Sequence, residues 1–435
     1  MLPETSHYWL RNAHIPACLL GVEPWRPQTA EGLCLTDLEV EGGQIRRLLP
    51  AGQVSWDGRD CPQVDLRQKI IFPPFIDIHT HLDKGHIWGR SPNPNGTFDG
   101  ALETVYRDVA RYYGAEDLYR RMEFGLKCSL AHGTTALRTH IDAFGKQGEI
   151  GFEVFNQLRR DWAERMILQG VCLVSVDYYQ TPDGIKLADR MAALGGVLGG
   201  VAYQNPQLKA QLTQVLRLAQ ERRLDLDLHV DETGDPRSRV LYQLALLVQE
   251  MNFTGKILCG HCCSLGVQTT ALVQETLAQV KAAGIAIVSL PMCNLYLQSR
   301  HHRHIPAWRG ITRVHQIREY RIPLAFASDN CRDPFYAFGD HDGLEVLTQS
   351  VRIAHLDHPY GDWCASVTRT PAQMMGLPHL GQLTPGQPAD FILFPARYFS
   401  ELFARSQSDR LVVRQGQPLQ AALPDYSELD DLIYP

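Results

Sequence analysis

The segment Phe72–Lys84, FPPFIDIHTHLDK, decides how the rest of the sequence is interpreted. An apolar run in it ends at Asp77, and His79 and His81 follow with one residue between them. Residues two apart on an extended strand point to the same face, so both imidazole rings would leave this strand side by side. One strand could then offer two ligands to one metal ion. A surface turn with two exposed histidines is the competing interpretation, because short motifs of this kind also occur by chance.

The composition is that of an ordinary globular protein. The 435 residues are 44% hydrophobic and 21% charged, with a formal net charge of −6. No basic run is present, which argues against a nucleic-acid or membrane-surface partner. Met1–Tyr8 lacks a basic and an apolar region, so no signal peptide is expected, and no apolar run approaches the ~18 residues that span a bilayer. The 11 cysteines have no framework-like spacing, and we expect reduced thiols in a soluble cytoplasmic protein.

Apolar strand-like runs alternate with helix-like segments from Ile70 to about residue 375. The eight runs are 70–81, 134–142, 167–177, 195–204, 224–232, 256–265, 284–294 and 322–330, and all but 256–265 end in a polar residue. The segments between them, such as Leu208–Arg222, carry apolar residues at three- and four-residue spacing. This eightfold alternation predicts an α/β fold with a parallel sheet closed as a (β/α)8 TIM barrel. A doubly wound open sheet is the alternative, but no glycine-rich phosphate loop follows an early strand.

Both ends of the chain depart from this alternation. Residues 1–69 contain short strand-like pieces separated by turn residues, and a Pro/Gly turn near residue 385 precedes the strand-like Asp390–Phe394. We therefore expect residues 1–69 and 378–435 to form one small β-sandwich domain. It would flank a metal-dependent barrel formed by residues 70–377.

The C-terminal ends of barrel strands carry the working residues of such a fold. Titratable and metal-binding side chains recur at these positions: His79, His81, His140, Asp142, Asp177, His229, Glu232, His261, Asp329 and Asn330. Three histidines and one aspartate suit Zn²⁺ or Fe²⁺, and such an ion lowers the pKa of a bound water toward neutrality. Glu232 lies three residues after His229 and could carry a proton beside the metal. His140 could instead be a core histidine, and Glu232 a surface carboxylate.

The sequence around His261 also matches a different kind of site. Cys259-Gly-His-Cys262 has the spacing of a thioredoxin-type dithiol motif. That motif belongs at the start of a helix after an early strand, where the helix N-terminus lowers a thiol pKa. Here it closes the sixth predicted strand, so a dithiol oxidoreductase is the weaker alternative.

Several motifs together resemble those of the amidohydrolase superfamily. They are HTHLDK at 79–84, RTHID at 138–142, HVDE at 229–232, the sixth-strand His261 and FASDN at 326–330. Within the superfamily, the cytosine deaminase branch is the most similar, on the segments at 294–300 and 309–339. PGQPADFILFPA at 385–396 resembles the closing β segment of the superfamily. The resemblance covers nearly the whole chain and implies a barrel with a flanking β-sandwich, in a homo-oligomer.

The resemblance also implies a mononuclear site. One divalent metal ion, Zn²⁺ or Fe²⁺, would be held by His79, His81, His229 and Asp329; the fourth strand has no lysine to be carbamylated. Asp329 would accept a proton from the metal-bound water, and His261 would orient the resulting hydroxide. Glu232 would protonate the ring nitrogen beside the attacked carbon. The implied reaction is hydrolytic deamination of an amidine-like carbon with release of ammonia.

At two positions the sequence differs from the pattern of the cytosine deaminase branch, and both concern residues expected to bind the substrate. Asn330 stands where a second acidic residue is usual, and we expect it to face the substrate ring. The base-binding glutamine after the third strand has no clear counterpart, and Asp177 or Gln180 could take its place. We therefore expect deamination of a cytosine-like aminopyrimidine, cytosine or 5-methylcytosine.

Two alternatives to this substrate and activity remain. SerAspAsn at 328–330 and Lys84 also resemble relatives that act on aminotriazines, so an aminohydrolase for N-isopropylammelide-like compounds or another heterocyclic amine is the first. A non-catalytic assembly protein built on the same barrel is the second. It is disfavoured because such a protein should have lost metal ligands, and this chain keeps the full set.

Overall fold

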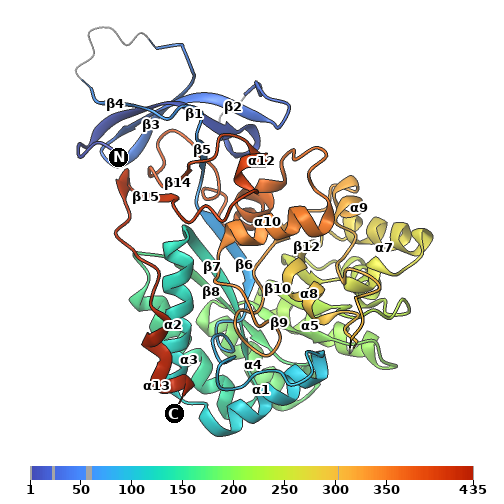
Figure 1. Cartoon of the computed structure of the whole chain (residues 1–435). Coiled ribbons are helices and arrows are strands. Elements are labelled where there is room, and N and C mark those ends of the chain that lie inside the picture. Colours follow the sequence, from blue (N-terminus) through green and yellow to red (C-terminus); the bar gives the residue numbers. More distant parts are fainter. Residues whose placement is uncertain (1, 22–24, 55–60, 302, 435) are drawn as a thin grey trace. The chain divides into compact units, whose positions relative to one another are not determined.

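The computed structural model describes residues 2–21, 25–54, 61–301 and 303–434 (Figure 1). The chain divides into two compact units, each assembled from segments far apart in the sequence. The first unit comprises Met1–Ile76, Ser129–Thr135 and Asp342–Leu423. The second comprises Asp77–Cys128, Ala136–His341 and Pro424–Pro435. No helix among the described residues is long and apolar enough to cross a membrane.

The first unit contains an eight-stranded sheet with strands from both ends of the chain. Its order is β16-β15-β14-β5-β1-β2-β3, and β4 pairs with β1. The strands are β1 (His7–Pro16), β2 (Leu33–Glu41), β3 (Gln44–Pro50), β4 (Gln63–Asp65), β5 (Ile70–Phe72), β14 (Phe391–Phe394), β15 (Leu411–Arg414) and β16 (Gln417–Pro418). The antiparallel pairing of β5 with β14 joins the two chain ends. The described strands of this unit form one sheet, and the two-layer sandwich stays a prediction.

Local sequence explains how this sheet forms. Gly42 and Gly43 make the two-residue connection between β2 and β3 with φ of 58° and 79°, and a tight hairpin turn with positive φ at both positions favours glycine. Buried apolar side chains from both chain ends then pack in one core, among them Leu38, Ile71 and Phe391.

The second unit is built on eight strands, of which β6 and β7 begin just before its bounds. They are β6 (Phe75–Thr80), β7 (Thr134–Asp142), β8 (Ile167–Leu173), β9 (Leu198–Ala202), β10 (Leu226–Val230), β11 (Ile257–His261), β12 (Ala286–Ser289) and β13 (Leu324–Phe326). They form a three-stranded sheet, β6-β7-β8, and a five-stranded sheet, β13-β12-β11-β10-β9. All pairings within the second sheet are parallel, as is β7 with β8.

Isolated bridges connect the two sheets at both edges. Val171↔Val197 and Ser175↔Val201 link β8 to the region of β9, and Thr80↔Asp329 links the end of β6 to the segment after β13. The strand order is therefore that of a TIM-type barrel. The described strands nevertheless form two sheets and not the single closed sheet that the alternation predicts.

The first predicted strand run is two strands. Pro73 and Pro74 separate β5 from β6, because proline has no N–H to donate and cannot continue a strand ladder. β5 pairs within the eight-stranded sheet, whereas β6 pairs with β7. The sequence analysis assigned the whole of 70–81 to the barrel, so its first three residues were assigned to the wrong sheet.

Helices alternate with the strands of the second unit. Those before β13 are α1 (Phe98–Tyr112), α2 (Ala115–Ala131), α3 (Gly145–Asp161), α4 (Pro182–Leu194), α5 (Leu208–Arg222), α6 (Val240–Glu250), α7 (Thr270–Ala282), α8 (Pro291–Leu297) and α9 (Val314–Glu319). After β13, α10 (Gly343–Ala354), α11 (Arg369–Met374) and α12 (Phe399–Leu402) belong to the first unit, and α13 (Asp430–Ile433) belongs to the second. Short 3₁₀ turns are η1 (Ala17–Leu19), η2 (Val176–Gln180), η3 (Cys263–Gly266), η4 (Trp363–Val367) and η5 (Tyr426–Leu429). α5 buries Leu212, Val215 and Leu216, the stripe that its apolar spacing predicts.

Candidate active site

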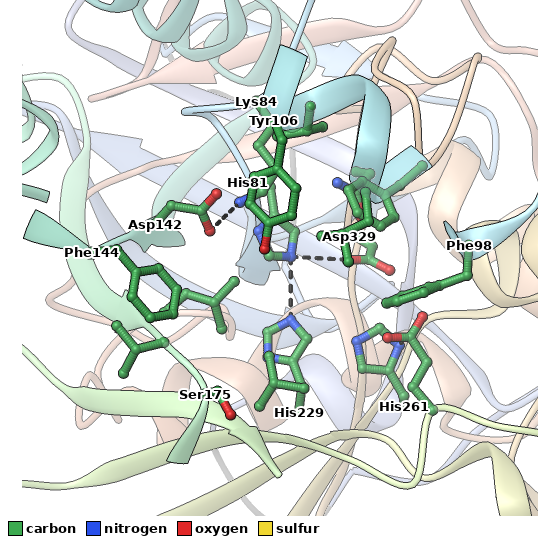
Figure 2. Close-up of a pocket in the computed structure, with 18 of the residues that line it drawn as sticks. His81, Lys84, Phe98, Tyr106, Asp142, Phe144, Ser175, His229, His261 and Asp329 are labelled. Atoms are coloured by element: carbon green, nitrogen blue, oxygen red, sulfur yellow. Dashed lines mark hydrogen bonds and ion pairs between the residues drawn. The ribbon is translucent and has the colours of Figure 1, made fainter. Parts of the chain in front are cut away.

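A cavity of about 270 Å³ lies at the C-terminal ends of the strands of the second unit. Figure 2 shows the side chains around it. The polar residues that line it include His81, Lys84, Asp142, Ser175, His229, Glu232, His261, Asp329 and Asn330. They follow or end strands β6, β7, β8, β10, β11 and β13, so the rule that places working residues at strand ends applies here.

Four predicted metal ligands converge at the base of this cavity. His79 and His81 leave β6 together, with ring centroids 5.4 Å apart. His229 Nε2 lies 3.3 Å from His81 Nε2. The Asp329 Oδ1 atom lies 3.3 Å from His81 Nε2 (Figure 2). It lies 3.6 Å from His79 Nε2. Three strands thus bring three imidazoles and one carboxylate to one point.

The chemistry of these donors fits a divalent metal ion. Among the described residues, both ring nitrogens of His79 and the Nδ1 atoms of His81 and His229 are buried without a hydrogen-bond partner. Burial lowers the pKa of all three histidines well below its usual value, which keeps the imidazoles neutral, as a metal ligand must be. Nitrogen and carboxylate ligands of this kind suit Zn²⁺ or Fe²⁺.

Main-chain contacts hold Asp329 against the end of β6. The N–H of Asp329 donates to the carbonyl of His79 at 2.9 Å. The hydroxyl of Thr80 donates to the carbonyl of Asp329 at 2.8 Å. Asp329 and His261 have φ of 61° and 68°. Residues other than glycine seldom adopt this conformation, and it persists chiefly where the surroundings require a side chain in one place. Burial raises the pKa of Asp329 to about 7.

Glu232 and His261 face each other beside the four ligands. Glu232 Oε1 lies 3.4 Å from His261 Nδ1, and Asn294 Nδ2 lies 3.0 Å from the same nitrogen. With Asn294 as the donor, His261 carries its proton on Nε2. Burial, and then the charge of Asp329, raise the pKa of Glu232 well above its usual value. This carboxyl can therefore hold a proton near neutral pH.

His140 belongs to the same cluster but not to the cavity lining. Its ring centroid lies 4.0 Å from that of His79 and 4.7 Å from that of His229. Asp227 Oδ1 is 3.7 Å from His140 Nε2, and Arg138 pairs with Asp227 at 2.8 Å. His140 is fully buried and is not among the described residues that line the cavity. Its position favours packing against the ligands over contact with a substrate.

Lys84 and Asp142 form a buried ion pair in the cavity wall. Lys84 Nζ donates to Asp142 Oδ1 at 2.7 Å and lies 3.5 Å from Asp83 Oδ2. Burial alone would lower the pKa of Lys84, but the two carboxylates outweigh it and raise this pKa. Lys84 is therefore a fixed cation at the cavity. The sequence analysis placed Asp142 among the strand-end residues and noted Lys84 only for its resemblance to relatives that act on aminotriazines.

Aromatic side chains line the rest of the cavity. They are Phe98 and Tyr106 of α1, Phe144 before α3, Tyr203 after β9, and Phe335. Figure 2 shows Phe98 and Phe144 on different sides of the histidines. The sequence analysis assigned none of these residues to the site, because no motif singles out an aromatic side chain, although Phe335 lies in the segment 309–339 that resembles the cytosine deaminase branch. The only other signal in the sequence is the three- and four-residue spacing of Phe98, Leu102, Val105 and Tyr106.

The residues predicted to bind the substrate have mixed positions. Asn330 lines the cavity, and its Nδ2 donates to Asp333 Oδ2 at 2.7 Å. Asp177 and Gln180 lie at exposed positions of η2 and are not among the described residues that line the cavity. β8 ends at Leu173, so the chain has already turned away by residue 177, and Ser175 lines the cavity in their place.

Cys259 and Cys262 do not have the environment of a redox pair. Both are buried free thiols, and burial raises the pKa of each well above its usual value. A reactive dithiol needs a lowered pKa, which a helix N-terminus or a nearby cation supplies. The dithiol alternative therefore has no physical support in the structure.

Comparisons with known proteins identify the family of this chain. Residues 146–420 match the amidohydrolase family. The chain is 44% identical to a pterin deaminase of Rhizobium rhizogenes over 99% of its length and 98% of that protein. It is 21% identical to an N-isopropylammelide isopropyl amidohydrolase of Pseudomonas sp., over 82% of this chain and 86% of that protein.

Solved structures share the fold. A 5-methylcytosine deaminase from Klebsiella pneumoniae, liganded with 5-fluorocytosine, superposes with a TM-score of 0.79 at 24% identity, over 96% of this chain and 98% of the other. An N-isopropylammelide isopropylaminohydrolase from Burkholderia multivorans gives a TM-score of 0.72 at 22% identity, over 95% and 98%. The chain therefore belongs to the amidohydrolase family and is a hydrolytic deaminase.

Proposed function

We propose that this protein is a metal-dependent pterin deaminase, which replaces the exocyclic amine of a pterin by oxygen and releases ammonia. The observation that carries the proposal is the 44% identity with a pterin deaminase over nearly the whole of both chains. The aromatic cavity walls support it, because a fused bicyclic ring offers a larger face for stacking than a single pyrimidine. Cytosine, predicted from the motifs, is the alternative, and its support is a structural likeness at 24% identity.

The metal would be held by His79, His81, His229 and Asp329. When bound, such an ion activates water for attack on an electron-poor carbon. Asp329 lies beside the histidine ligands and can take a proton from that water and deliver it to the leaving amine. The amine departs as ammonia when the carbon–nitrogen bond breaks, a carbonyl forms at the same carbon, and the proton that remained on the attacking oxygen passes to the Glu232 carboxylate.

Glu232 and His261 would complete the proton transfers. The protonated Glu232 carboxyl donates a proton to the ring nitrogen beside the attacked carbon, and this nitrogen must be protonated before the amine can leave. His261 keeps a proton on Nε2 and stabilises the negative charge that develops on the attacking oxygen. Asn294 is a positioning residue, because it fixes the His261 ring without facing the cavity.

The remaining lining would orient the substrate ring. Aromatic side chains such as Phe98 and Tyr106 would stack on its face. Lys84 has three donors, and those not used by Asp142 and Asp83 can meet a ring oxygen or nitrogen. Asn330 offers an amide at the other edge of the ligand cluster.

The direct test is ammonia release from a substrate panel. Purified protein with known metal content would be assayed on pterin, a 6-substituted pterin, cytosine, 5-methylcytosine and N-isopropylammelide. We expect kcat/KM for a pterin to exceed that for either cytosine by at least about 100-fold, because a site shaped for one ring leaves its polar groups unpaired with the other. Faster turnover of a cytosine would restore the prediction from the motifs. Release of isopropylamine alone would favour the triazine alternative.

A further inference from the structure

A second cluster of metal-binding side chains lies in the same unit, outside the cavity. His86, Cys331 and His341 each offer one donor atom, and these atoms lie within 4.8 Å of one another. All three residues are buried. None is among the described residues that line the cavity, and none has a place in the proposed reaction.

The His86 ring has no hydrogen-bond partner to account for its burial. Only 4% of His86 is exposed, and neither ring nitrogen has a hydrogen-bond partner among the described residues. The ring packs edge-on against Phe124 at 4.8 Å and lies 5.4 Å from the His341 ring. Buried polar atoms are almost always satisfied by a partner, so two orphaned nitrogens that face a cysteine and a histidine point to a missing ligand.

The backbone around the cluster is shaped to bring these side chains together. His86 and His341 have φ of 64° and 54°, a conformation that residues other than glycine rarely adopt. The His86 N–H donates to the carbonyl of Cys331 at 3.2 Å, so the two segments are already joined by the main chain. Gly125 of α2 makes room for the third ligand, because a Cβ there would lie 3.0 Å from His341 Nε2.

Cys128 of α2 is the candidate for a fourth donor. Cys128 is 1% exposed and packs with Phe124. Its thiol has Cys331 and Asp340 as electrostatic neighbours. Two histidines and two cysteines are a donor set that binds Zn²⁺ in closed, four-coordinate structural sites.

We propose that His86, Cys331 and His341 hold a second metal ion, a thiophilic divalent cation such as Zn²⁺, with Cys128 as the fourth ligand. The ion ties the loop after β6 to the segment after β13. His81 and Lys84 lie on that loop, and Asp329 and Asn330 lie on that segment. The ion thereby fixes both cavity-lining segments from a position outside the cavity, where it does not contact the substrate.

Cobalt substitution tests this site separately from the catalytic one. The four proposed catalytic ligands carry only nitrogen and oxygen donors, whereas the second site contains thiolate. Apo protein reloaded with Co²⁺ should therefore bind two ions per chain and show the near-ultraviolet charge-transfer band of cobalt–thiolate bonds. His229→Ala should remove one ion and keep the band. Cys331→Ser should remove one ion and abolish the band.

A matched control and a second variant make the outcome decisive. Cys172→Ser changes another buried cysteine, which contacts Tyr179 Oη at 3.3 Å, and should keep both ions and the band. If Cys331→Ser does not fold, His86→Asn gives the same information, because asparagine tolerates the positive φ and removes the imidazole. A single Co²⁺ per chain with no thiolate band in the wild-type protein would overturn the proposal, as would a band that survives in either variant.

Discussion

Glu232 is the proposed proton donor to the substrate ring. Its carboxyl lies beside the ligand cluster, and burial raises its pKa. Glu232→Gln keeps the shape of the side chain but cannot exchange a proton. We expect kcat to fall by about 10² to 10⁴-fold, the usual contribution of a general acid–base group. Metal content should stay at the wild-type value, because Glu232 is not among the proposed ligands. Parallel measurement of ammonia release and bound metal checks both statements, and near-normal turnover would remove the proton-transfer role.

The ligand residues could be predicted because their signal is local. His79 and His81 face the same way through the two-residue period of a strand, and His229, His261 and Asp329 stand where strands end. The expectation that residues at strand ends face the cavity also placed Asp177 and Gln180 there, but neither is among the described residues that line it. The apolar run 167–177 does not show that the strand stops at Leu173, since a 3₁₀ turn can carry the same apolar residues. The catalytic and ligand roles of these residues stay predictions that the variants above test.

At the scale of elements, α1 is the helix that shapes the substrate side of the cavity. Tyr106 lines the cavity although 60% of the residue is exposed, so its removal should leave stability nearly unchanged. We expect Tyr106→Ala to raise KM about tenfold with a smaller change in kcat, because a lost aromatic stacking contact is worth about 1.4 kcal/mol. Glu103→Ala, an exposed residue of the same helix that is not among the lining residues, is the control. An unchanged KM on the preferred substrate would show that α1 does not contact it.

Arg90 links α1 to α2 through buried ion pairs. It donates to Asp108 of α1 at 2.8 Å and to Asp117 of α2 at 2.5 Å, and 3% of its side chain is exposed. Burial alone would raise the pKa of Asp117, but Arg121 and Arg90 outweigh it and lower this pKa. The pairing therefore stabilises the fold above the ordinary aspartate pKa, and this stabilisation is lost as the pH falls through the lowered value.

Removal of Arg90 should accordingly destabilise the protein strongly. Arg90→Met keeps much of the volume but leaves the buried Asp108 carboxylate without its guanidinium partner, which costs about 3–5 kcal/mol, while Asp117 keeps Arg121. Arg120→Met is the matched control, because Arg120 pairs with the exposed Asp431 and such surface pairs contribute about 1 kcal/mol or less. Urea unfolding at neutral pH measures both variants. Equal losses in the two variants would show that the Arg90 network does not stabilise the fold.

Most strands could be predicted, and the exceptions have a physical cause. Seven of the eight predicted runs contain one observed strand each, since buried parallel strands read as apolar runs bounded by polar residues. The first run failed because apolar content is the same on both sides of Pro73-Pro74, and only the missing N–H groups mark the break. α1 went unpredicted, although Phe98, Leu102 and Tyr106 have the apolar spacing of a helix.

For the whole molecule, the amidohydrolase family was recognised correctly from the sequence, and the finer choice of substrate was not settled by it. The motifs contain the ligands and proton-transfer groups, which relatives with different substrates share. The residues that would select the ring, such as Phe98, Tyr106 and Phe144, lie outside the motifs and meet only in the folded chain. The predicted homo-oligomer and the cytoplasmic location stay predictions.

Removal of metal is the prediction that concerns the whole protein. Three neutral imidazoles and a carboxylate packed in a buried site have unsatisfied polar atoms that a cation would satisfy. An ion that binds only the folded state stabilises it by RT ln(1 + [L]/Kd), about 2.7 kcal/mol at 100 times Kd. Protein stripped with a chelator should therefore lose turnover and melt at a lower temperature. Zn²⁺ or Fe²⁺ should restore both properties in the wild type.

His229→Ala separates the catalytic ion from any other in the same experiment. This variant should hold less metal than the wild type and should not regain turnover when Zn²⁺ or Fe²⁺ is added, because one of the four ligands is gone. His379→Ala, which changes an exposed histidine, should behave as the wild type does. Metal analysis, ammonia release and thermal melting of the three proteins complete the test. Full turnover in protein with only trace metal would show that the buried histidines serve packing alone and that the deaminase works without the ion.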